Sequence, residues 1–416
     1  MKNKVFNLVL EIKNDYISKF GEITYDKGDY KSCVELWIDK LQNPLYEEIF
    51  SLIETSQNKN LILLRYGNYT DVFSAEIDLI EFYYLHDGLY KECRSIVIDV
   101  ENEKIVILPF DKFFNINEVE ETKIDNIRDI ILNAEYIDFT DKMDGSMQTA
   151  TYYNNQYIMA GSKSIDPEKS WRLADGYSLL NEDYKKALKE FYDFTFIFEY
   201  ISEEDAHVVI YEEDKKGLYL IGIRNNLNGR FFNYNQLLQV ANEFNLKITK
   251  KHSLTLDEVL ETLPKYKSSE KEGYVMHAVV NNKDYFVKIK CNDYVAMHNI
   301  LSMMSSPNLL IRNIADDKFD DFYSKVPEVH RKRILGLAKY IFKYIRDLNR
   351  ITIETSEVCK KYSSDLKEQM IWITNNVDKE FQHSVRTYVK KGELLNHLKN
   401  GKDGYIKMSD IDKFYN

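Results

Sequence analysis

The spacing of apolar residues changes once along the chain, near Pro307, and this change constrains the fold most. From about residue 60 to 300, short β-rich runs such as KIVILPF, QYIMAG, FTFIFEYI, LYLIGIR, GYVMHAVV and YFVKIK are separated by helical or turn segments. This pattern is typical of an α+β domain. After Pro307 the apolar residues recur at helical spacing, most clearly over 334–348 and 366–377. We therefore expect an α+β domain followed by an all-helical domain.

The N-terminal segment is expected to be mostly helical. FNLVLEIKNDYISKF and SCVELWIDKLQNPLYEEIFSLI each carry an apolar face with a period of 3.6 residues. A chain of 416 residues with 44% hydrophobic content is long enough for more than one domain. We expect a helical leader at 1–60 that packs on a catalytic domain at 61–305, and a helical domain at 306–416 that determines RNA specificity.

Composition restricts the cellular location and the kind of nucleic-acid site that we expect. The four cysteines form no CxxC or Cys/His pattern, and no run of about 18 apolar residues occurs. We therefore expect a soluble, cytoplasmic monomer without a membrane partner, in the host cytoplasm if the source is viral. The net charge of −11 opposes general binding to polyanions, since Lys and Arg supply that affinity. Any nucleic-acid site must be local.

The segment DKMDGSM contains the strongest candidate for a nucleophile. Lys142 follows an expected strand and precedes Asp144-Gly145-Ser146, a turn sequence that can present an amine at a fixed edge. The alternative is an ordinary hairpin turn, because Asp-Gly is a common hairpin signal. Other motifs must decide between the two.

Two lysines share one face of the expected strand YFVKIK. Strand alternation places Lys288 and Lys290 together and opposite Val287 and Ile289. Such a pair is usually solvated. It also suits a site that binds phosphates and lowers the pKa of a nearby lysine, which an amine nucleophile requires.

Two glutamates adjoin apolar strands and could organise a divalent cation together. Glu199 lies near the end of FTFIFEYI, and Glu272 precedes GYVMHAVV. For each, the alternative is a strand end that reaches water.

Arg94 begins the run RSIVID, and Lys112 lies in LPFDKFFNINE. Arginine and lysine are good phosphate partners, although FFN could equally be core plus turn. The chain has no GxxxxGK[ST] motif, which excludes a P-loop as the ATP site.

Taken in order, CRSIVID, PFDKFF, KMDGS, FIFEYI, EGYVMHAV and FVKIK resemble the motifs of the covalent nucleotidyltransferases, which include nucleic-acid ligases and mRNA capping enzymes. The segments FDKFFNINE and EGYV and the helical tail are similar to the bacteriophage RNA ligase 1 family, whose members repair cleaved tRNA. The resemblance covers roughly residues 60–320. It implies an ATP-grasp-like adenylation domain with antiparallel sheets, ATP as cofactor, and Mg²⁺ or Mn²⁺.

The resemblance also implies roles for individual residues. Lys142 would attack the α-phosphate of ATP with the help of Glu199, Lys288 and Lys290, and Glu199 and Glu272 would bind ribose or metal. The remaining nucleotide-site residues implied are Tyr66, Arg94, Lys112 and Lys163, although in AGSKSI the glycine precedes the Ser-Lys pair instead of following it. Tyr294 resembles an RNA-site position. Asp316 and Asp317 resemble a second metal site, with plain surface charge as the alternative.

The helical tail contains a basic stripe that the resemblance does not explain. In HRKRILGLAKYIFKYIRDLNR, helical spacing gathers four cations opposite an apolar face. The four are Lys339, Lys343, Arg346 and Arg350. A solvated helix face is one explanation, and contact with an RNA backbone is the other.

The sequence therefore predicts an ATP-dependent RNA ligase that joins RNA 5'-phosphate and 3'-hydroxyl ends through a lysyl-adenylate. The substrate would include tRNA, and a kinase/phosphatase could heal the ends first. The alternatives are a DNA ligase, a capping-type nucleotidyltransferase, and a non-catalytic RNA-binding relative.

Overall fold

The computed structural model describes residues 3–67, 79–205, 208–209, 211–295, 297–298, 319, 323, 326, 328–379 and 381–392. The chain divides into two compact units, residues 1–294 and 295–416. The division lies before the boundary at 305 that the sequence led us to expect. No helix among the described residues is both long and apolar enough to cross a membrane.

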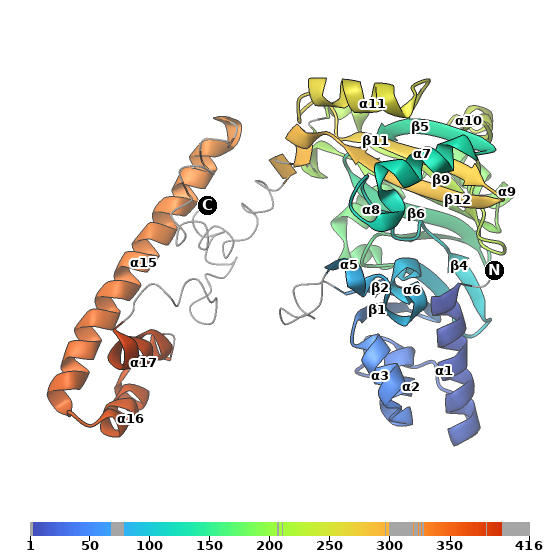
Figure 1. Ribbon diagram of the computed structural model, residues 1–416. Coiled ribbons are helices and arrows are strands. Elements are labelled where there is room, and N and C mark those ends of the chain that lie inside the picture. The colour runs from blue at the N-terminus through green and yellow to red at the C-terminus, as the bar shows by residue number, and fades with distance from the viewer. Residues whose placement is uncertain are drawn as a thin grey trace. The chain divides into compact units, whose positions relative to one another are not determined.

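Over the residues that the structure describes, the first unit is an α+β structure with three four-stranded antiparallel sheets (Figure 1). The first sheet has the order β1-β2-β3-β4, with bounds Ile53–Asn58, Leu61–Tyr66, Arg94–Asp99 and Lys104–Ile107. The second has the order β10-β5-β11-β12, with bounds Lys251–His252, Tyr136–Lys142, Gly273–Val280 and Lys283–Lys290. The third has the order β7-β6-β8-β9, with bounds Gln156–Ala160, Ser146–Tyr153, Phe194–Ile201 and Gly217–Asn225. The expected α+β class with antiparallel sheets is confirmed.

The helices of the first unit flank these sheets. They are α1 Lys4–Phe20, α2 Cys33–Leu41, α3 Pro44–Phe50, α5 Leu79–Phe82, α6 Leu85–Glu92, α7 Ile124–Leu132, α8 Trp171–Leu179, α9 Glu182–Glu190, α10 Tyr234–Glu243 and α11 Leu256–Thr262. Short 3-10 helices occupy 120–122, 167–169, 203–205, 213–215 and 263–265. Each β-rich run that the sequence analysis singled out forms a strand.

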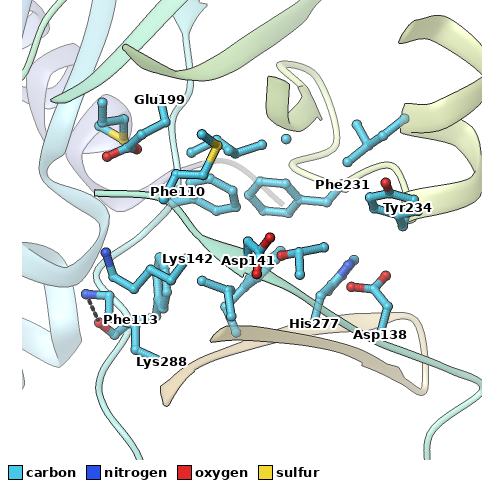
Figure 2. A pocket seen from close by; sticks show the side chains of 18 of the residues that line it. Phe110, Phe113, Asp138, Asp141, Lys142, Glu199, Phe231, Tyr234, His277 and Lys288 are labelled. Carbon is cyan, nitrogen blue, oxygen red and sulfur yellow. Dashed lines mark hydrogen bonds between the residues drawn. The ribbon is translucent and has the colours of Figure 1, made fainter. Parts of the chain in front are cut away.

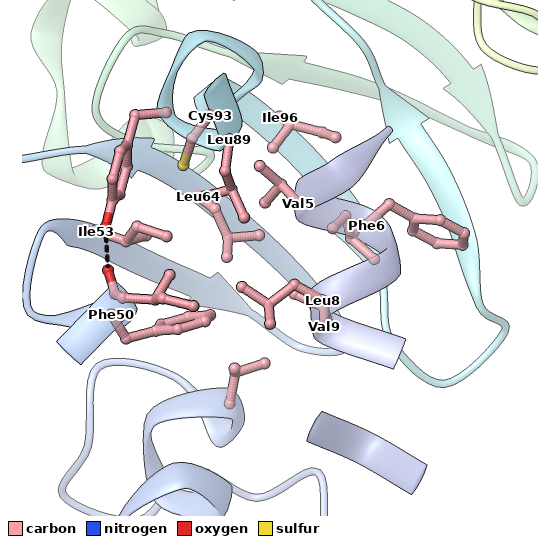
Figure 3. Close-up of a cluster of buried hydrophobic side chains, with 14 of the residues drawn as sticks. Val5, Phe6, Leu8, Val9, Phe50, Ile53, Leu64, Leu89, Cys93 and Ile96 are labelled. Carbon is pink, nitrogen blue, oxygen red and sulfur yellow. Dashed lines mark hydrogen bonds between the residues drawn. The ribbon is translucent and has the colours of Figure 1, made fainter. Parts of the chain in front are cut away.

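The N-terminal helices pack on the first sheet through a buried apolar cluster (Figure 3). Val5 and Val9 of α1 meet Leu64 and Ile96 of the sheet in this core. The expected long helix after residue 32 is two helices, because Pro44 takes the first position of α3 and cannot continue α2. The range 1–60, expected to be helical, also contains strand β1.

The second unit is helical in the part that the structure describes. Its helices are α15 Glu328–Tyr362, α16 Leu366–Asn376 and α17 Gln382–Lys391. Cys359, Ile373 and Val385, one from each helix, form a buried cluster that joins the three helices. The expected helical C-terminal region is confirmed.

Candidate active site

A cavity of about 270 Å³ lies between the second and third sheets of the first unit. Strands β5, β11 and β12 supply one wall, and β6, β8 and β9 supply the other. Five residues singled out from sequence line it together: Arg94, Lys142, Glu199, Lys288 and Lys290. Figure 2 shows Lys142 and Lys288 at one end of the cavity and His277 and Tyr234 at the other.

The segment between Lys142 and Ser146 connects two different sheets. Lys142 is the last residue of β5, whose partners are β10 and β11, whereas Ser146 begins β6, whose partners are β7 and β8. The hairpin interpretation is therefore wrong, because the strands on either side of the turn do not pair with each other. The turn presents Lys142 where the two sheets meet.

Asp144 fixes this turn. Its Oδ2 accepts hydrogen bonds of 2.8 Å from the backbone N–H groups of Val208 and Val209. Its Oδ1 accepts a 2.6 Å bond from the Tyr294 hydroxyl, and its own N–H donates to the Tyr211 hydroxyl at 3.0 Å. Tyr294 is 2% exposed, so the structure places this residue beneath the turn as a support.

Gly145 allows the turn to pass close to strand β8. A Cβ atom at this position would lie 2.2 Å from the carbonyl oxygen of Tyr200, so no other residue fits without moving backbone. The Gly145 N–H donates to Glu199 Oε1 at 3.0 Å. The backbone after the nucleophile candidate thus orients the carboxylate that lines the cavity.

Glu272 joins two of the lysines. Its Oε2 accepts from Lys142 Nζ at 2.7 Å, and its Oε1 lies 3.0 Å from Lys290 Nζ. The Glu272 side chain is 2% exposed, so this pairing takes place away from water, where charge interactions are strong. Because both oxygens contact ammonium groups, the structure gives Glu272 the role of holding the lysines in place.

Lys288 is the most perturbed cation of the cavity. Burial lowers its pKa well below the ordinary value, and the neighbouring charges of Arg94, Lys112, Lys142 and Lys290 lower it further. Its Nζ donates to the carbonyl oxygen of Phe113 at 3.0 Å, as the dashed line in Figure 2 shows. Such crowding of cations is costly without an anion, so this end of the cavity suits the binding of phosphate groups. We call the four cations that line the cavity, Arg94, Lys142, Lys288 and Lys290, the phosphate floor.

The pKa of the Glu199 carboxyl group lies close to neutral pH. Burial raises its pKa to about 7, and the negative charges of Glu272 and Asp144 add to the rise, while Lys142 and the Gly145 N–H oppose it. Perturbed groups that face a cavity are typical of functional sites. A bound cation would favour the charged form of this carboxylate.

Aromatic rings form the wall away from the lysines, and the sequence analysis did not assign them to the site. Phe110 stacks on Phe231 with ring centroids 4.9 Å apart, and Phe286 stacks on His277 at 4.3 Å. Flat apolar surfaces of this kind suit a heteroaromatic base. Phe110 and Phe286 lie in the motifs PFDKFF and YFVKIK, and strand alternation puts Phe286 on the face of Lys288, so that signal was present. Nothing local marks Phe231.

Comparison with known proteins bears on the same part of the chain. Residues 92–294 match the profile of a family described as RNA ligase, the T4 RNA ligase 1 family. They contain the turn, the phosphate floor and Glu199. The family expected from the ordered motifs is confirmed for this segment.

Two curated relatives carry the words RNA ligase in their names. A candidate bifunctional polynucleotide kinase/RNA ligase of Autographa californica nuclear polyhedrosis virus is 26% identical over 59% of this chain, although the match spans only 36% of the viral protein. A candidate RNA ligase of Thermovibrio ammonificans is 24% identical over 78% of this chain and 84% of its own length. Among solved structures, an archaeal ATP-dependent RNA ligase aligns over 76% of this chain and 82% of its own, with 11% identity and a TM-score of 0.43.

Besides Glu272, which contacts the cavity lysines without lining the cavity, two residues assigned to the nucleotide site lie within the RNA ligase segment but do not line this cavity. Lys112 lines a neighbouring groove, with its Nζ 4.7 Å from the Tyr83 ring centre, and burial followed by the charge of Arg94 lowers its pKa. Lys163 is exposed on the loop after β7.

The other assigned residues lie outside the RNA ligase segment. Tyr66 packs edge-on against Tyr83 at 5.4 Å and is not among the cavity-lining residues. Asp316 and Asp317 lie outside the described residues. The described part of the chain contains no group of three or more His, Cys, Asp or Glu side chains suited to a metal. The four cations of the tail, Lys339, Lys343, Arg346 and Arg350, are exposed on α15.

Proposed function

We propose that the protein is an ATP-dependent RNA ligase in which Lys142 carries AMP as a covalent intermediate. The observation that supports this most is the placement of the Lys142 amine beside the buried Glu272, next to Lys288 and Lys290 in one cavity. Cations gathered around an amine nucleophile suit attack on a phosphoanhydride, because charge develops on the phosphate oxygens.

In the first step the Lys142 nitrogen bonds to the α-phosphorus of ATP, and the bond to pyrophosphate breaks. Glu272 Oε2, which accepts the hydrogen bond from Lys142 at 2.7 Å, is placed to take the proton that the amine loses. Lys288, Lys290 and Arg94 would bind the phosphates and stabilise the departing pyrophosphate. The purine would lie against the aromatic wall of Phe110, Phe231 and Phe286.

In the second step an oxygen of an RNA 5'-phosphate attacks the same phosphorus and releases the lysine, which recovers its proton. This makes a 5'-5' anhydride between AMP and the RNA. In the third step an RNA 3'-hydroxyl attacks the RNA phosphorus, loses its proton, and displaces AMP. One set of fixed cations serves all three steps, which favours residues on a rigid strand such as β12.

A divalent cation fits the site through Glu199 and the nucleotide phosphates. Glu199 faces the cavity and has a pKa raised to about 7 by burial, so a cation would compensate its charge. Glu272 fits less well, since lysines occupy both of its oxygens. When bound, Mg²⁺ or Mn²⁺ would withdraw electron density from the α-phosphate.

The substrate we propose is RNA with a 5'-phosphate and a 3'-hydroxyl, including broken tRNA. The name of the viral relative joins a polynucleotide kinase to an RNA ligase. This supports an end-healing partner that prepares such ends for the present chain.

The test is transfer of label from α-labelled ATP to protein, followed by circularisation of a 5'-phosphorylated RNA with magnesium. Lys142→Ala should reduce labelling at least about 10³-fold, whereas Lys186→Ala, on the exposed side of α9, should not. Labelling of the Lys142→Ala protein at the normal rate would refute the site. Preference for GTP would indicate a capping-type enzyme, and preference for nicked DNA over RNA would indicate a DNA ligase.

A further inference from the structure

Trp171, the first residue of α8, is an exposed aromatic that neither the core nor the cavity uses. Its exposed fraction is 48%, whereas Trp37 is completely buried. The guanidinium carbon of Arg172 lies 4.8 Å from the Trp171 ring centre. An exposed flat ring beside a fixed cation is the combination that binds the base and phosphate of a single strand.

The Trp171-Arg172 pair is anchored to the strand that follows the nucleophile. Arg172 pairs with Asp205, whose side chain is 1% exposed, and Asp205 Oδ2 accepts a 2.6 Å bond from the Ser146 hydroxyl. The Gln148 amide donates to the Arg172 carbonyl oxygen at 2.7 Å. Ser146 and Gln148 both belong to β6, and Ser146 is four residues after Lys142. The tryptophan therefore has a fixed place near the turn that presents Lys142.

A second connection reaches the phosphate floor. The loop after β7 runs from Gly161 to the helix α8, and the Ser95 hydroxyl donates to the Ser162 carbonyl oxygen at 2.8 Å. Ser95 is adjacent to Arg94, which lines the cavity. Exposed Lys163 thus lies on a loop that begins beside the floor and ends at Trp171.

We propose that Trp171 and Arg172 bind the RNA strand that carries the 5'-phosphate, with a base near the 5' end stacked on Trp171 and a backbone phosphate on Arg172. The inference rests on the proposed function, because it assigns the substrate of its second step. That step brings a 5'-phosphate to the adenylate on Lys142, so the following nucleotides must leave past the rim of the cavity. Base stacking needs no particular sequence, which suits an enzyme that repairs varied RNA ends.

The test separates the RNA step from the ATP step. Enzyme that has already been labelled with AMP is mixed with a short 5'-phosphorylated RNA, and the single-turnover rate of transfer is measured against RNA concentration. Trp171→Ala should raise the half-saturating RNA concentration between about fivefold and about 100-fold. Trp171→Phe should restore most of the binding, and both variants should take label from ATP at the normal rate.

Intrinsic fluorescence gives an independent readout. Binding of the 5'-phosphorylated RNA should quench tryptophan emission in the wild type and in the matched control Trp372→Phe, whose ring is on α16, but not in Trp171→Phe. Unchanged RNA transfer in Trp171→Ala, or quenching that persists in Trp171→Phe, would overturn the inference while leaving the ligase proposal intact. A wild type that takes no label from ATP would instead overturn the ligase proposal, and the quenching experiment could still be read.

Discussion

The cations of β12 and those of α15 differ in what surrounds them, although both follow a simple periodic pattern. Lys288 and Lys290 line a cavity beside the buried Glu272, and burial, followed by neighbouring positive charges, lowers the pKa of Lys288. Lys339 and Lys343 are exposed on their helix. Arg350 pairs there with Glu354, one turn along the helix, in an exposed bridge of 3.2 Å.

The comparison shows that position determines what a cation can do in an acidic protein. Water and salt weaken the interactions of exposed charges. A buried cluster of cations is screened much less, so an anion is needed to compensate its positive charge. A net charge of −11 is therefore compatible with tight phosphate binding at one cavity. We expect chemistry to depend on the phosphate floor, and α15 to affect only RNA affinity.

Removing Lys288 should give the largest effect. Lys288→Met should slow label transfer from ATP about 10³-fold, since a fixed phosphate contact is lost. The same change should raise the melting temperature at pH 7, because the lowered pKa means that protonation of Lys288 opposes folding. This gain should shrink as the pH rises toward 10.5, where the unfolded lysine also loses its proton. Lys283→Met, at the exposed start of β12, is the control for both measurements.

Glu272→Gln should come next, with about a 10²-fold loss of label transfer. The amide keeps the shape of the side chain but removes the charge that holds Lys142 and Lys290. Single-turnover rates with saturating ATP would measure the effect. Glu261→Gln, on the exposed side of α11, changes the same chemical group without touching the site. Equal rates for the two variants would contradict the role given to Glu272.

The pH dependence of the first step should show the burial of Glu199. A pKa of about 7 leaves roughly a tenth of the carboxylate ionised at pH 6, so label transfer there should be roughly a tenth of its plateau above pH 8. The rate should rise with pH because a divalent cation binds the charged form of the Glu199 carboxylate. Glu199→Gln should be slower and should lose this rise near pH 7. A rise of the same shape in the variant would assign it to another group.

The smallest effect should follow from neutralising the exposed stripe. Replacing Lys339, Lys343, Arg346 and Arg350 with glutamine should weaken RNA binding about fivefold at low salt and flatten its salt dependence. Label transfer from ATP should stay within about twofold of the wild type. A large fall in label transfer would contradict the view that α15 affects RNA affinity and not the chemical step. Unchanged RNA affinity and salt dependence would mean that the stripe is only solvated.

Local pattern was enough to predict part of this site. Strand alternation placed Lys288 and Lys290 on one face, and turn chemistry located the end of β5 at Lys142, because both depend on a few neighbouring residues. Helical period likewise predicted the buried positions Ile334 and Ile341 of α15.

The remaining features depend on contacts between distant segments. Nothing near Glu272 indicates that it joins Lys142, 130 residues away, to Lys290. The hairpin interpretation failed because strand pairing depends on contacts across a whole sheet and not on the turn residues alone. Phe231 enters the aromatic wall through its stacking on Phe110, a contact that no local period records.

The passage from β5 to β6 has a mechanical consequence. Residues 143–145 are all that separate strands that belong to different sheets, and hydrogen bonds to Asp144 and Gly145 leave them no slack. Because Lys142 belongs to β5, its amine moves with the second sheet, and the short connection ties that sheet to β6 of the third sheet. Adding even one residue here would leave Lys142 on β5 but would loosen its fixed spacing to β6 and the third sheet, so we expect the length of this connection to matter as well as the lysine.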